Sequence, residues 1–215
     1  MTDVWSERAE AFRTSPTHAA GEDLDLLVDW CEPGPGVTAL DVATGGGHVA
    51  RRLREAGCDV VSLDPAPGMQ ADVLASAEEI PFADASFDVV ACRIAPHHFP
   101  DVRAAVREMA RVSRDRVVVE DNLFFDEASE QAERLRDPSH VRCYSAAEWR
   151  SFFELAGLDV VDERRFDRRV PLQGWLDRVG CEGDDAERVK ELLAHRIDGD
   201  TVSMATLVVK GRKRG

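Results

Sequence analysis

The sequence has little positive charge for its length. Its 215 residues include 27 Lys and Arg residues against 41 Asp and Glu residues, a formal net charge of −14. Such a surface repels the phosphates of DNA and RNA, so we expect no nucleic acid partner. The basic residues near the end, in segment 210–214, are too few to reverse this balance, and we expect them to form a solvated tail.

Long hydrophobic runs are also missing. No stretch approaches the roughly 20 apolar residues that a membrane-spanning helix needs, and the opening residues Met1 to Glu7 do not resemble a signal peptide. The five cysteines, at positions 31, 58, 92, 143 and 181, form no Cys-x-x-Cys pair and are odd in number. This pattern indicates free thiols in a reducing compartment, so we expect a cytoplasmic protein with no membrane partner.

Several catalytic motifs are absent as well. The chain has no Gly-x-Ser-x-Gly motif and no Cys–His pattern for covalent catalysis. No group of His, Cys and Asp residues has metal-ligand spacing, so we predict no bound metal. The single tyrosine, Tyr144, is followed at the fourth position by Glu148, which disfavours the Tyr-x-x-x-Lys pair of a short-chain NAD(P) oxidoreductase.

What is present is an alternation of apolar runs and amphipathic segments. Strands are predicted at 37–43, 60–64, 71–74, 89–91, 116–120, 158–161 and 201–210, and helices at 22–31, 49–56, 102–109, 126–136, 146–156 and, less regularly, 172–197. Ser145 and Glu148 form a capping-box pattern before the fifth of these helices. Alternation of this kind predicts one α/β domain with a mostly parallel sheet and helices on both faces. Ligands of such sheets bind at the carboxyl ends of the strands.

The turn after the first strand is rich in glycine. Gly45-x-Gly47-x-x-Ala50 fits the dinucleotide-binding fingerprint, but it also fits any strand-to-helix turn that needs positive φ. Asp41 lies in the strand four residues before Gly45, and a carboxylate there disfavours a pyrophosphate at the helix N-terminus. It suits S-adenosylmethionine (SAM), which carries a sulfonium and an ammonium group. Asp64, at the end of the second strand, could accept bonds from a ribose or simply cap a turn.

Four segments carry a family resemblance when taken in order, namely Ala39–Gly47, Ala77–Val90, Cys92–Phe99 and Arg107–Val112. Together they resemble the motifs of class I SAM-dependent methyltransferases, in the ubiquinone/menaquinone-biosynthesis-like (methyltransferase type 11) branch. The segment Leu135–Arg142 followed by Glu148-Trp149 resembles a narrower subgroup, and the similarity spans roughly residues 8–165. It implies a Rossmann-like fold with a mostly parallel seven-stranded sheet and an antiparallel last strand.

The resemblance also assigns positions in this chain to the SAM site. These positions are Phe12, His18, Asp41, Ala43, Gly45, Gly47, Asp64, Pro65, Ala77, Glu78 and Arg93. It implies that Asp64 binds the ribose diol, that Ala77 and Glu78 lie near the adenine edge, and that Arg93 lies near the methionine end. Phe12 and His18 match an N-terminal pattern that closes over SAM. Ser76 departs from the family, where an aspartate often faces the adenine amine.

Methyl transfer from SAM depends mainly on alignment of the reactants, and a base is needed only where the acceptor must lose a proton. His140, after the break at Asp137-Pro138, is a candidate base or acceptor-orienting group, and equally a loop histidine paired with an aspartate. His97 and His98 are second candidates; they either contact SAM or acceptor, or cap the turn before Pro100.

The predicted organisation is a single domain over residues 1–215. Residues 1–30 would form a helical cap, and residues 166–197 an insertion at the acceptor pocket with Trp175 and Leu176 in its wall. Arg136 and Arg142 would bind an anionic acceptor or pair with surface acids. We therefore expect a SAM-dependent methyltransferase with a small-molecule acceptor. A SAM-binding protein without turnover and an NAD(P)-dependent oxidoreductase are the alternatives, and the oligomeric state and the acceptor are not defined by the sequence.

Overall fold

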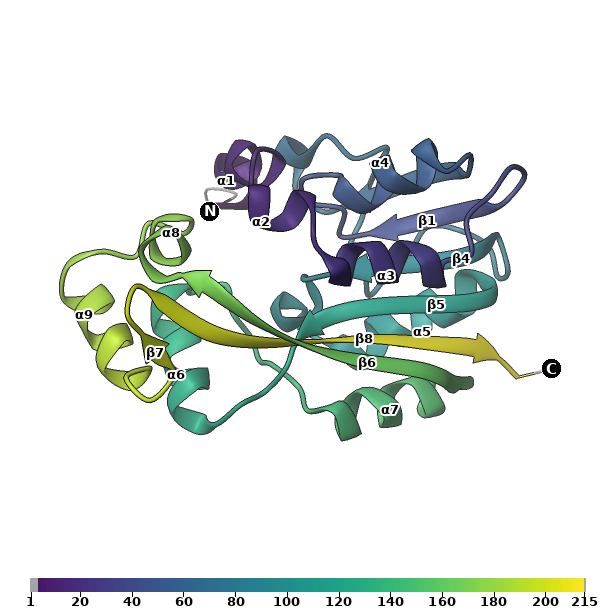
Figure 1. Ribbon diagram of the computed structural model, residues 1–215. Coiled ribbons are helices and arrows are strands. Elements are labelled where there is room, and N and C mark those ends of the chain that lie inside the picture. The colour runs from purple at the N-terminus through teal and green to yellow at the C-terminus, as the bar shows by residue number, and fades with distance from the viewer. Residues whose placement is uncertain (1–3, 215) are drawn as a thin grey trace.

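A central mixed sheet organises the computed structural model, which describes residues 4–214 apart from the side chains of residues 16 and 17. Its strands are β1 (Thr38–Val42), β2 (Asp59–Asp64), β3 (Val73–Leu74), β4 (Phe87–Arg93), β5 (Ser113–Asn122), β6 (Leu158–Pro171), β7 (Ile197–Asp198) and β8 (Thr201–Lys213). The sheet order is β3-β2-β1-β4-β5-β8-β6 (Figure 1). Pairs among β1 to β5 are parallel, and β8 is antiparallel to both β5 and β6.

Helices cover both faces of this sheet, as the apolar runs predicted. One face packs against α3 (Glu22–Trp30) and α4 (His48–Glu55), and the other against α5 (Val102–Val112) and α7 (Ala146–Leu155). The capping box of α7 forms as expected, because the Ser145 hydroxyl accepts the Glu148 N–H and the Glu148 carboxylate accepts the Ser145 N–H. Trp149 and Phe153 of α7 are fully buried, which confirms them as core residues. The predicted seven-stranded Rossmann-like fold is therefore correct, with the two-residue β7 added beside β8.

The end of the chain departs most from the prediction. β6 continues to Pro171 rather than ending near Val161, and β6 and β8 run together beyond the other strands (Figure 1). Their far end supports α6 (Glu127–Arg136), α8 (Leu172–Asp177) and α9 (Gly183–Leu192), which share an apolar cluster of their own. Much of β6 is exposed and charged because it is an edge strand, and this pattern lacks the apolar run by which the sequence analysis recognised strands.

The N-terminal helices lie at the carboxyl ends of the parallel strands. α1 (Val4–Arg13) packs on the 3-10 turn η1 (Pro67–Met69) that follows β2, where the Ser6 hydroxyl accepts the Gly68 N–H at 2.7 Å. η1 is the single turn that stands between β2 and β3. α2 (Pro16–Ala19) then leads into α3. Within residues 4–214, no helix has the length and apolar character needed to cross a membrane.

Candidate functional site

A cavity of about 410 Å³ opens at the carboxyl ends of β1, β2 and β4. This volume is within the usual range for small-molecule sites. Its wall includes ten of the eleven cofactor positions predicted from the resemblance; the exception is Gly47. The lining residues are Trp5, Phe12, His18, Asp41, Ala43, Thr44, Gly45, Gly46, His48, Val49, Asp64, Pro65, Met69, Ser76, Ala77, Glu78, Arg93, Ile94, Ala95, His98, Phe99 and Pro100.

The glycine turn folds around the buried carboxylate of Asp41. Oδ2 of Asp41 accepts the Thr44 hydroxyl at 2.5 Å and the Ala50 N–H, in the first turn of α4, at 3.0 Å. Gly45 and Gly47 have φ values of 51° and 74°, so the turn does need the positive φ that glycine adopts readily. Gly47 caps α4 and lies outside the wall. Burial raises the pKa of Asp41 to about 6, so this carboxyl is mostly ionised at neutral pH.

Asp64 ties the end of β2 to the same turn. Its Oδ2 accepts the Gly45 N–H at 3.0 Å, and its Oδ1 accepts the Ala66 N–H at 2.9 Å. The turn-capping role is therefore real. The same carboxylate lines the cavity, and a carboxylate oxygen has room for further bonds. Binding of a ribose diol by Asp64 stays a prediction.

The N-terminal segment closes over the turn through close backbone contact. Nε2 of His48 lies 3.0 Å from the Phe12 carbonyl oxygen, and the ring centroids of Phe12 and His18 are 5.6 Å apart. A Cβ on Gly46 would lie 2.6 Å from the Phe12 carbonyl oxygen. Glycine is therefore required at position 46 because the N-terminal segment passes directly over it, a reason the sequence pattern did not reveal.

Arg93, predicted near the methionine end of SAM, is held by a buried ion-pair network. Its Nε donates to Glu120 at 2.5 Å, Nη2 to Asp23 at 2.7 Å, and Nη1 to the His18 carbonyl at 3.0 Å. Arg168 of β6 adds a bond to Asp23 at 2.9 Å. Burial raises the pKa of Glu120 to about 8. Burial also acts to raise the pKa of Asp23, but the hydrogen bond from Glu120 and the charges of Arg168 and Arg93 outweigh it. The pKa of Asp23 is therefore lowered to about 2. No local sequence pattern pointed to Asp23, Glu120 or Arg168, because their partners come from distant segments.

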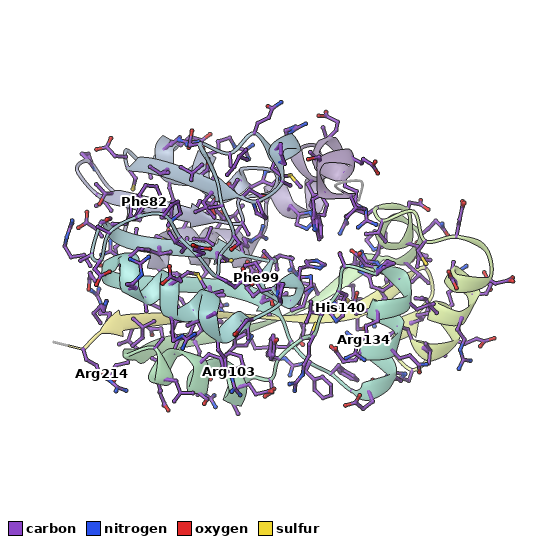
Figure 2. All side chains as sticks on the ribbon, turned by 180° about the vertical axis from the view of Figure 1, so that it is seen from behind. Phe82, Phe99, Arg103, Arg134, His140 and Arg214 are labelled. Carbon is purple, nitrogen blue, oxygen red and sulfur yellow. The ribbon has the colours of Figure 1, made fainter. Side chains whose placement is uncertain are left out.

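The three candidate catalytic histidines form one group, but only His98 of the three lines the cavity. The ring centroid of His97 lies 4.1 Å from that of His98 and 5.6 Å from that of His140. Nδ1 of His97 lies 2.6 Å from Oδ1 of Asp121, and Nε2 of His140 lies 3.2 Å from Oε2 of Glu130. Figure 2 shows His140 close to α6, the helix that carries Arg134. His140 is thus buried and paired with a glutamate, rather than with an aspartate.

Burial sets the titration of the two neighbouring histidines. It lowers the pKa of His97 to about 4 and that of His98 to about 3, so both rings are neutral at pH 7. A neutral imidazole at the cavity wall can accept a proton, although so low a pKa makes it a weak base. Burial likewise raises the pKa of Asp121 to about 8.

A potential ligand set does occur away from the cavity. Glu130, His140 and Cys143 are buried, and one ligand atom from each lies within 4.8 Å of the other two. These residues are brought together by α6 and the following loop, and their spacing in the sequence gave no signal. Glu130 already binds His140 and the Cys143 N–H. The prediction that the protein holds no metal stays a prediction.

The segment expected to shape the acceptor pocket is placed beside the cavity rather than in its wall. Trp175 and Leu176 are buried in the apolar cluster of α6, α8 and α9, so neither lines this cavity. Arg136 stacks 3.9 Å over the Trp175 ring and pairs with Glu133, and Arg142 pairs with Glu148. For these two arginines, pairing with nearby acids is what the structure shows.

Comparisons with known proteins agree with this geometry. A model of a methyltransferase domain family matches residues 40–119. The uncharacterized methyltransferase YcgJ of Bacillus subtilis is 34% identical over 215 residues, covering 89% of this chain and 83% of that protein. Its crystal structure aligns with a TM-score of 0.81 at 29% identity, covering 90% of this chain and 98% of that one. A putative methyltransferase from Bacillus halodurans aligns with a TM-score of 0.79 at 26% identity, over 91% of this chain and 100% of that one.

These relatives share the fold, and the matched family model spans the glycine turn, β2 and β4. The identity to YcgJ extends over 89% of this chain, well beyond the residues that the family model matches. The chain belongs to the class I SAM-dependent methyltransferases.

Proposed function

We propose that the protein binds SAM in the cavity and transfers its methyl group to a small-molecule acceptor by in-line displacement, releasing S-adenosylhomocysteine. The observation that carries this proposal is the bond from the Ala50 N–H to Asp41. A donor in the first turn of α4 is thereby already taken by a carboxylate, at the place where a dinucleotide enzyme binds a pyrophosphate. Such an arrangement disfavours NAD and suits a ligand that carries positive charge.

The residues of the cavity would divide their roles by position. Asp64 and Gly45 would hold the ribose, and Pro65, Ala77 and Glu78 the adenine. Phe12, His18 and Trp5 would cover the ligand, as part of the helical cap over residues 1–30. When bound, SAM supplies an activated methyl group next to a good leaving group. The protein then contributes mainly alignment, which can lower a barrier by about 7–11 kcal/mol.

An acceptor that must lose a proton would pass it to His98. This ring lines the cavity and is neutral at pH 7. His97 and His140 stand behind it, with His97 in contact with His98, and we assign both a positioning role. The segment 166–197 would border the acceptor from the far side of His18. A cytoplasmic location is supported by the five cysteines, all of which are free and buried.

Calorimetric titration with SAM, S-adenosylhomocysteine and NAD tests the cofactor. We expect binding of the first two and none of NAD; the reverse would overturn the proposal in favour of an oxidoreductase. Formation of S-adenosylhomocysteine across a panel of small acceptors then tests turnover. Tight SAM binding with no turnover on any acceptor would favour a SAM-binding protein that performs no transfer.

A further inference from the structure

Arg178 follows α8, and its charge has no partner among the residues that the structure describes. The side chain is half-buried, yet it makes no hydrogen bond or ion pair with any residue that the structure describes. Burial lowers its pKa, and the nearby charges of Arg136 and Arg168 lower it further. Leaving a buried cation without a counter-ion is costly, so this arrangement points to a missing anion.

The carboxylates of the region are already committed to other arginines. Asp23 binds Arg93 and Arg168, and Glu120 binds the same two arginines. Glu133 pairs with Arg136, and Asp137 with Arg8. Arg178 is the fifth arginine beside these four carboxylates. The region therefore carries an excess of positive charge, although the chain as a whole has a net charge of −14.

A second unused donor belongs to Arg168. Its two terminal nitrogens bind Asp23 and Glu120, but its Nε is fully buried and has no hydrogen-bond partner in the described part of the chain. A buried N–H of a guanidinium is nearly always satisfied in native proteins. The guanidinium of Arg168 is thus incompletely satisfied, and its positive charge acts on Arg178 at the end of α8.

Both arginines are linked to the cavity wall. Arg93 and His18 line the cavity; Arg93 donates to the His18 carbonyl, and Asp23 joins Arg93 to Arg168. Burial and then the charge of Arg178 lower the pKa of His18. Nη2 of Arg8 donates to the Val179 carbonyl at 3.1 Å, which holds the chain beside Arg178 against α1. Figure 1 shows α8 next to α1 and α2.

We propose that Arg178 binds an oxyanion of the methyl acceptor at the His18 and Arg93 side of the cavity, with the positive charge of Arg168 beside it. The substrate class is then a small molecule that carries a carboxylate or a phosphate group. A guanidinium suits both groups because its planar donors match two oxygens at once. This inference rests on the proposed function, since the anion is assigned to the acceptor of that same reaction.

The test uses the full-length protein saturated with S-adenosylhomocysteine, at constant ionic strength. The melting temperature is followed while one of three compounds is added: benzoate, inorganic phosphate or benzamide. Benzamide is the uncharged control for benzoate because it has nearly the same shape. We expect a saturable rise with benzoate or phosphate and none with benzamide; the preferred anion separates a carboxylate from a phosphate acceptor. In Arg178→Met the apparent affinity for that anion should fall at least about 10-fold, the loss of one charge-assisted bond. Arg178→Lys should recover part of it.

Arg107→Met is the matched control, because it removes the same charge from an exposed position on α5 and should titrate like the wild type. Removing Arg178 deletes an unpaired charge, so the anion-free Arg178→Met protein should melt no lower than the wild type. Identical anion titrations in the wild type and Arg178→Met, or no saturable response of the wild type to either anion, would overturn the inference. Failure of the proposed function would instead appear as absent binding of S-adenosylhomocysteine to the wild type.

Discussion

The backbone N–H of Gly45 donates to Oδ2 of Asp64 across 3.0 Å, which joins the turn after β1 to the end of β2. One carboxylate thereby fixes the spacing between the two strand ends that form the floor of the cavity. The same carboxylate is the predicted ribose ligand, so the turn and the cofactor would share it. A change at Asp64 should therefore affect both the turn after β1 and the binding of the cofactor.

Asp64→Asn should weaken binding of S-adenosylhomocysteine by about 10- to 100-fold, because hydrogen bonds to a charged group contribute about 1.5–3 kcal/mol. The amide keeps the shape of the side chain but loses the charge and one acceptor. Calorimetric titration measures the loss. Asp59→Asn, at the exposed start of β2, is the control and should bind normally. If the wild type, Asp64→Asn and Asp59→Asn bind S-adenosylhomocysteine with equal affinity, Asp64 does not bind the ribose.

His98→Ala should lower turnover by about 100-fold or more with an acceptor that must lose a proton, the usual contribution of a positioned base. Binding of S-adenosylhomocysteine should change little. His140→Ala should lose less turnover, because His140 lies behind His98 against Glu130. The two variants are compared by kcat on one acceptor found in the panel. If His140→Ala shows the larger loss at wild-type cofactor affinity, then His140 is the base.

Gly46→Ala should separate the N-terminal segment from the glycine turn. The new Cβ would lie 2.6 Å from the Phe12 carbonyl oxygen and 2.9 Å from Nε2 of His48, both too close. Overpacking of this kind costs about 1–3 kcal/mol. We expect faster hydrogen exchange in α1 and weaker binding of S-adenosylhomocysteine. Gly34→Ala meets no atom within 4 Å and serves as the control; unchanged exchange in α1 of Gly46→Ala would contradict the packing argument.

Stability should fall with acidity through His97. Burial lowers its folded pKa to about 4, below the ordinary value of 6.5. The unfolded chain therefore binds the proton first, and the free energy of unfolding drops as the pH falls from about 6.5 through 4. Between pH 7 and pH 5 this histidine should account for roughly 2 kcal/mol.

Urea unfolding of the wild type and His97→Asn at both pH values measures that slope. The variant starts less stable because Asp121 loses its partner, but its stability should depend less steeply on pH. A slope identical to that of the wild type would show that His97 does not drive acid unfolding.

Ser145→Ala should destabilise the protein by about 1 kcal/mol, within the usual range for loss of an N-cap. The Ser145 hydroxyl accepts the Glu148 N–H and thereby satisfies one of the free donors at the start of α7. The midpoint of urea unfolding reports the change. Ser151→Ala lies on the exposed face of the same helix and should cost little. Losses of equal size would mean that the cap contributes nothing.

Local sequence patterns predicted most of the fold and of the cofactor cavity. Strand β1, the glycine turn and the acid at the end of β2 lie within 27 residues, from Thr38 to Asp64, and each is recognised by short-range periodicity or residue type. The length of β6 was underestimated, because an exposed, charged edge strand has no apolar run. The short β7 was missed because two residues carry no periodic signal.

The sequence by itself determined the order of elements and the position of the ligand edge, because backbone alternation and turn chemistry act over a few residues. The ten residues of the cavity wall came from the resemblance of its ordered motifs to methyltransferases. Only the tertiary structure decided which side chains meet across long separations. It separated His98, in the wall, from His140, paired with Glu130, and it joined Asp23 to Arg93 and Arg168. Among residues 4–214, it also left Arg178 without a counter-ion. Such pairings depend on how packed elements approach one another in space, and no local pattern encodes that distance.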